Sequence, residues 1–150
     1  MEQNSTMVTE ILNVLYKISK RKTTEGYTFI LMNSIKEELQ LKYPFLTKIR
    51  FKDIRFIEEN NFIISDPKIE NVPKKQVCYA LRDVLKVMNE YLGRDAGPFF
   101  YKEISVKISD TVNETMQQYG IDLQIMQLEK EIQDLEKRII KTTKNIHLWQ

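Results

Sequence analysis

The stretch IDLQIMQLEKEIQDLEKRIIKTTKNIHLW, residues 121–149, decides how this chain is organised, because it keeps the 4-3 spacing of a coiled coil over nine positions. The a positions are Ile125, Ile132, Ile139 and Ile146, and the d positions are Ile121, Leu128, Leu135, Thr142 and Trp149. As a helix, the stretch forms a rod of about 43 Å. Its apolar stripe must be covered by another helix of the same chain or by another chain.

The sequence alone does not decide which helix covers this stripe. Isoleucine at a with leucine at d favours a parallel dimer. The flanking charges oppose it, because a parallel homodimer places Glu131 at g opposite Glu136 at e of the second copy. The apolar face is also wider than a two-stranded seam, which is typical of a helix within a bundle. The residues that widen it are Leu123, Met126, Ile140 and Leu148. Antiparallel pairing and packing within one chain therefore remain alternatives.

Length and composition are those of a folded protein with one ordinary domain, or a small domain and a helical appendage. The 150 residues are 42% hydrophobic and 29% charged, and the net charge of +2 does not imply a polyanionic partner. The single cysteine, Cys78, excludes an intrachain disulfide framework and suits a reducing compartment. No apolar run reaches transmembrane length and no signal-peptide pattern opens the chain. We expect a cytoplasmic protein without membrane contact.

Patterns along the chain predict a mainly helical α+β fold in three sections, 1–72, 73–120 and 121–150. In the first section, apolar spacing predicts a helix over 7–22. The segment from Tyr27 to Tyr43 is open to a strand over its first residues, 27–32, and has helical spacing after them until Pro44 stops it. Alternation from Ile49 to Phe56 predicts a strand with a bulge near Asp53, turning at Asn60-Asn61 into 62–64. A short helix beginning at Pro44 is the alternative for residues 45–53.

The middle section has the pattern of an αα-hairpin. One apolar face runs from Val77 to Leu92 and ends at Gly93, a natural C-terminal cap. A tight link leads to Pro98, at the first position of a second helix that we expect to run to Tyr119. At least one ring of the aromatic cluster at residues 99–101 must point away from its inner face. The third section is the coiled-coil helix.

Residues that carry chemistry are nearly absent from the sequence. The only histidine, His147, lies close to the end of the printed chain, and Cys78 has no histidine or second cysteine pattern beside it. No phosphate-binding, dinucleotide-binding or serine-hydrolase motif occurs. Arg94 in the link before Pro98 is a weak candidate for holding an anion. We therefore expect no enzyme, no metal and no cofactor.

Two functions fit these patterns. The first is a non-catalytic regulatory or assembly module that binds through helix surfaces, as a homo-oligomer, most simply a dimer, or with a helical protein partner. Its self-association residues are Ile121, Ile125, Leu128, Ile132, Leu135, Ile139 and Ile146.

The alternative is a winged-helix DNA-binding regulator, dimerised by its helical C-terminal region, with residues 45–53 as recognition helix. Between Lys17 and Arg55, ten lysines and arginines stand against four acidic residues. The nucleic-acid contacts would be Lys48, Arg50, Lys52 and Arg55. A small-molecule sensor is a third class, and it requires a pocket between the two helices of the middle section.

Overall fold

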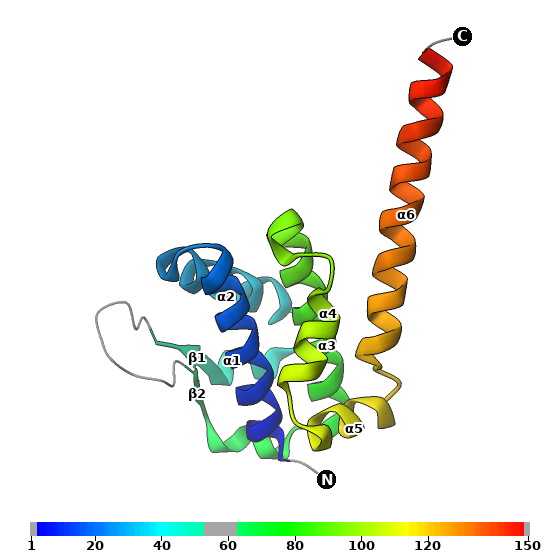
Figure 1. The fold of residues 1–150 in the computed structure, drawn as a ribbon. Coiled ribbons are helices and arrows are strands. Elements are labelled where there is room, and N and C mark those ends of the chain that lie inside the picture. Colours follow the sequence, from blue (N-terminus) through cyan, green and yellow to red (C-terminus); the bar gives the residue numbers. More distant parts are fainter. Residues whose placement is uncertain (1–2, 53–62, 149–150) are drawn as a thin grey trace.

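The structure is a computed structural model that describes residues 3–52 and 63–148. The predicted mainly helical α+β fold is confirmed (Figure 1). In chain order the elements are α1 (Asn4–Lys22), α2 (Glu25–Leu39), the 3-10 helix η1 (Pro44–Lys48), β1 (Ile49–Phe51), β2 (Ile63–Ser65), the 3-10 helix η2 (Pro67–Asn71), α3 (Lys74–Leu92), the 3-10 helix η3 (Gly93–Ala96), α4 (Phe100–Lys107), α5 (Asp110–Gln118) and α6 (Leu123–Leu148).

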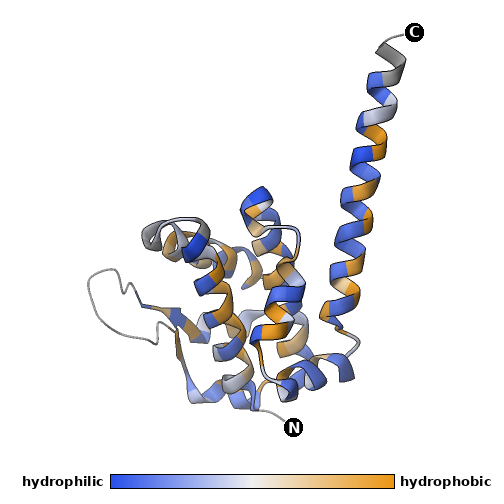
Figure 2. Ribbon diagram, viewed as in Figure 1, coloured by the Kyte–Doolittle hydropathy of each residue, from blue (hydrophilic) through white to orange (hydrophobic). Residues whose placement is uncertain are grey.

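The hydrophobic core is built around α1. Its apolar residues recur at helical spacing, and several, including Met7, Ile11, Leu15 and Ile18, are completely buried. The helix packs against α2, α3 and α4 as well as η2 and η3. We call the elements from α1 to α5 the body, and Figure 2 shows the apolar positions of these helices gathered towards its middle. Elements from both ends of the body therefore share one core, and it extends from Met7 to Met126.

Residues 44–51 combine the two structures that the sequence left open. Pro44 begins the five-residue η1, and the chain then enters β1, where Ile49 is buried and Arg50 is exposed. Strand β1 pairs antiparallel with β2, with Phe51 opposite Ile63. The expected bulge near Asp53 and the turn at Asn60-Asn61 lie outside the described residues. Among the described residues 45–52, one continuous helix is not formed, because residues 49–51 pair as a strand.

The second helix of the predicted αα-hairpin is interrupted, and this part of the prediction is wrong. Helix α4 ends at Lys107, the backbone of the following Ile108 is extended, and α5 begins after Ser109. The Ser109 hydroxyl accepts a hydrogen bond from the Val112 N–H, as an N-cap does. The Ser109 N–H donates to the carboxylate of Glu10 on α1. The capping side chain and α1 thus satisfy the backbone groups that a continuous helix would have paired.

A polar cluster ties the segment after α2 to α3 and gives the first testable prediction. The Asp83 carboxylate accepts hydrogen bonds from the Tyr43 hydroxyl at 2.6 Å and from Arg82 Nε at 3.0 Å. Burial raises the pKa of Asp83, but these bonds outweigh it and hold the pKa below its ordinary value. A lowered folded-state pKa stabilises the fold above the ordinary value of about 3.9, and this contribution is lost as the pH falls through the folded-state pKa.

We expect Asp83→Asn to lower the free energy of unfolding by about 1–2 kcal/mol at pH 7. The difference from the unmodified chain should shrink when both are compared near pH 3, because the carboxylate of the unfolded chain takes up a proton below its ordinary pKa of about 3.9 and the folded chain then gains less from the charged form. Urea unfolding at the two pH values measures it. Asp95→Asn is the control, since Asp95 is exposed and should change stability little at either pH. A penalty that is equal at both pH values would contradict the assignment.

Candidate helix-pairing surface

Helix α6 has two faces that point in opposite directions, one packed against the other helices and one exposed. At about 100° per residue, Leu123, Met126, Gln127 and Lys130 fall on one side of the helix. Leu123, Met126 and Gln127 are all buried, and this side packs against α4. The heptad positions fall on the other side. We call Ile125, Leu128, Ile132, Leu135 and Ile139 the seam.

Every residue of the seam is uncovered. The exposed fractions are 54% for Ile125, 57% for Leu128, 55% for Ile132, 55% for Leu135 and 57% for Ile139. The values do not fall towards the body, so the described chain does not cover the seam even where α6 lies on α4. Figure 1 shows α6 projecting beyond the other helices, and Figure 2 shows the apolar positions recurring along it. Among the described residues, packing of the seam within its own chain is therefore not observed.

The two ends of the predicted stripe differ from its middle. Ile121 is only 3% exposed and lies in the core of the body, before α6 begins. It does not continue the exposed seam, because residues 120–122 turn the chain from α5 into α6 and bring Ile121 inward. The side chain of Ile146 and residue Trp149 lie outside the described part of the structure. The seam that the structure defines therefore begins at Ile125.

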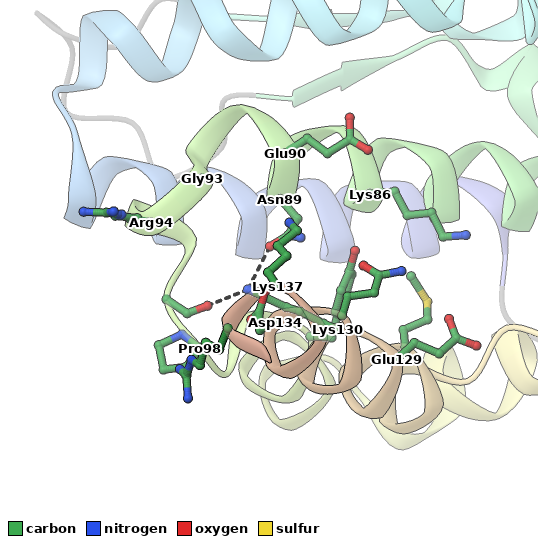
Figure 3. A pocket seen from close by; sticks show the side chains of 15 residues that line it. Lys86, Asn89, Glu90, Gly93, Arg94, Pro98, Glu129, Lys130, Asp134 and Lys137 are labelled. Carbon is green, nitrogen blue, oxygen red and sulfur yellow. Dashed lines mark hydrogen bonds between the residues drawn. The ribbon is translucent and has the colours of Figure 1, made fainter. Parts of the chain in front are cut away.

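Polar contacts hold the first turns of α6 on the body and set the direction of the seam. Lys130 Nζ donates to Asn89 Oδ1 at 3.0 Å and to the Gly97 carbonyl at 2.6 Å (Figure 3). The Gln127 side chain donates to the Pro98 carbonyl at 2.7 Å and accepts from the Lys102 N–H at 3.2 Å. Burial lowers the pKa of Lys130. These four contacts fix the rotation of α6, so the seam faces away from the body.

Sequence reasoning missed Gln127 and Lys130. They occupy the c and f positions of the heptad, where a polar residue is normally on the solvent side. Their partners are mainly backbone carbonyls and an N–H near residues 97–102, which carry no side-chain signature. Only the apolar pair Leu123 and Met126, which widened the predicted stripe, indicated that a second face of this helix is buried.

A cleft of about 840 Å³ lies between α3, the link from Gly93 to Pro98, and α6. Its walls carry both signs of charge, with Lys86, Lys137 and Arg138 alongside Glu90, Glu129 and Asp134 (Figure 3). Burial, together with the charges of Glu90 and Glu129, raises the pKa of Tyr101 to about 12. The Lys130 ammonium is already bonded to the body. The lining holds five basic side chains against three acidic ones, and the exposed Arg94 is one of the five, so the charge of the cleft is mixed.

The four basic residues of the DNA-binding alternative do not share a helix. Lys48 ends η1 and is half-buried, Arg50 is exposed on β1, and Lys52 follows that strand. Arg55 lies outside the described residues. Because η1 has only five residues and leads directly into a strand, the part of the chain that the structure describes contains no recognition helix at this position.

The groups that could carry chemistry are not brought together. Cys78 is completely buried, and burial raises the pKa of its thiol to about 11, so it is a poor nucleophile at neutral pH. The side chain of His147 lies outside the described part of the structure. Within residues 3–52 and 63–148, histidine, cysteine and acidic side chains form no group of three that could hold a metal ion.

Comparison of the chain with protein families, curated proteins and solved structures found no significant match. Along the described ranges, no helix has both the length and the apolar composition that a membrane span requires. Among the described residues, six of the thirteen exposed large hydrophobic side chains lie on α6, and five of these form the seam.

Proposed function

We propose that this chain is a non-catalytic regulatory or assembly module that self-associates through the seam of α6. The observation that supports it most is the uniform exposure of five regularly spaced isoleucines and leucines. A continuous apolar stripe on an outward-facing helix is a typical interaction surface, because leaving it in water is unfavourable. The body holds the base of α6 rigidly, so little order is lost when the seam pairs.

A second copy of the chain is the partner that the spacing favours. Unbroken a and d positions from Ile125 to Ile139 allow each side chain to enter a hole between four side chains of an identical helix. Each seam side chain that leaves water contributes on the order of 1–2 kcal/mol. The seams of two copies thus offset the roughly 4–15 kcal/mol that association costs.

The DNA-binding alternative has little support from the described residues. It depended on a recognition helix over 45–53, and the described part of that segment is a 3-10 turn followed by a strand. The local excess of positive charge between Lys17 and Arg55 is then consistent with the exposed side of amphipathic elements. We therefore keep self-association as the proposed function. We place the module in the cytoplasm, since its single cysteine is buried and unpaired.

Sedimentation equilibrium of the whole chain tests the proposal. Over about 1 to 100 μM, we expect the average mass to rise from 17.9 kDa towards twice that value. Because the contact is apolar, the association should persist when the salt concentration is raised, unlike one made by surface ion pairs. A mass of 17.9 kDa throughout this range would contradict self-association.

A further inference from the structure

We propose that the α6 helices of two copies pair antiparallel, with Ile132 opposite the partner's Leu135. This inference rests on the proposed function and adds the orientation and register of the pair. In an antiparallel coiled coil, each a position lies opposite a d position of the other helix. The pairing of Ile132 then sets all the other layers: Leu128 lies opposite the partner's Ile139, and Ile125 lies opposite the partner's Thr142.

This register covers the whole seam. Each of its five residues meets a heptad position on the described part of the other α6. A shift of seven residues towards the N-terminus would place Ile139 opposite the partner's Ile121, which is buried in the body and cannot pair. The opposite shift would place Arg138 against the partner's Arg138 and Glu136 against the partner's Glu136, and like charges repel there.

The charges that flank the seam favour the antiparallel orientation. A parallel pair brings Glu131 beside the partner's Glu136, twice by symmetry, with no attractive pair to offset it. The antiparallel pair brings g beside g and e beside e. Glu131 then faces the partner's Arg138, which is attractive, while Glu129 faces the partner's Glu136. Both Glu131 and Arg138 are exposed on the single chain, and although Glu131 Oε1 accepts a hydrogen bond from the Gln127 side chain, its other carboxylate oxygen can make this contact.

The position of the body leaves room for a partner helix and determines the shape of the antiparallel pair. The body is attached to the side of α6 opposite the seam, through Leu123, Met126, Gln127 and Lys130, so it does not obstruct a partner helix. In the antiparallel register, residues 123–130 of one helix lie opposite residues 137–144 of the other. The attachment points of the two bodies are then about 20 Å apart along the rod. The pair would be a two-ended module that presents identical bodies on opposite sides.

A charge reversal distinguishes the two orientations by the sign of its effect. In the antiparallel pair, Glu131→Arg places arginine opposite the partner's Arg138, and we expect the dissociation constant to rise about tenfold. The double variant Glu131→Arg with Arg138→Glu restores opposite charges and should return it close to the original value. In a parallel pair, Glu131→Arg would instead face the partner's Glu136 and tighten association. Tighter association of the single variant would overturn the proposal.

Cysteine cross-linking tests the register directly. Leu128→Cys combined with Ile139→Cys should give a covalent dimer on mild oxidation with copper phenanthroline, because the two positions face each other across the pair. Leu128→Cys alone should not, since the two copies of residue 128 would be about 16 Å apart. The buried Cys78 does not compete.

The outcomes of the cross-linking separate the failure of this inference from that of the proposed function. A covalent dimer of the single variant indicates a parallel pair and overturns the orientation. A dimeric mass with no cross-link in any variant overturns the register. A monomeric mass of the unmodified chain contradicts self-association itself.

Discussion

Replacing both Leu128 and Leu135 by lysine is expected to convert the self-associated protein into a monomer of 17.9 kDa with a folded body. Both positions lie on the seam, so they are at the contact whether the two helices pair parallel or antiparallel. Two lysines in each chain would place four ammonium groups in the contact of each pair, where apolar side chains lay before. Losing about 1–2 kcal/mol for each of the four leucines in the pair weakens association by at least about a thousandfold. Sedimentation equilibrium at the same protein concentrations measures the loss.

Ile140→Lys is the matched control for this change. Ile140 is 56% exposed and Leu135 is 55% exposed, so the two side chains are equally accessible on the single chain. They differ in position, because Ile140 lies outside the a and d positions. Leu135→Lys alone should weaken association, whereas Ile140→Lys should leave it nearly unchanged. Equal effects would mean that the pairing surface is not the seam. Far-ultraviolet circular dichroism of each variant checks that the helices remain.

The heptad spacing predicted the seam correctly in one respect, the face of the helix on which Ile125 to Ile139 lie. Periodicity fixes this face, because it depends only on the rise and rotation of the helix. Periodicity does not determine which part of the protein, if any, covers a given face of the helix. That outcome depends on Gln127 and Lys130, whose bonds to carbonyls near Gly97 are tertiary and have no local pattern.

The predicted fold is wrong where a local signal for the end or start of a helix interrupts a run of apolar residues at helical spacing. The spacing from Phe100 to Met116 suits one helix, but Ser109 followed by Asp110 is also a helix-start pattern, and Glu10 from α1 reinforces it. Ser109 and Glu10 are 99 positions apart in the chain, so no pattern among neighbouring residues could have revealed this contact. In the same way, Ile121 fits the heptad but is buried, since the turn before α6 directs it into the body.

The aromatic cluster after the link was predicted with one ring pointing away from the core, and the structure assigns this position to Phe99. Phe99 is 59% exposed, whereas Phe100 is 1% exposed. The Phe100 ring lies edge-on to Tyr101, with centroids 5.2 Å apart, and Lys130 Nζ is 5.8 Å from its centroid. Phe100 therefore joins α4 to the base of α6. Phe99 and Phe100 are adjacent and of the same type but differ in burial, so substitutions at these two positions form a matched pair.

Phe100→Ala is expected to lower the free energy of unfolding by about 3–5 kcal/mol, since it leaves a cavity and removes the ring contacts of Tyr101 and Lys130. This is a large part of the roughly 5–15 kcal/mol that stabilises an ordinary domain. Phe99→Ala should change it by no more than about 0.5 kcal/mol.

Urea unfolding should be measured in the chain that already carries Leu128→Lys and Leu135→Lys, because self-association would otherwise make stability depend on protein concentration. Similar penalties for the two alanine variants would show that Phe100 does not seat α6 on the body. A large penalty for Phe100→Ala but not for Phe99→Ala would instead show that the stability of the body depends on the contact that holds α6 with its seam outward.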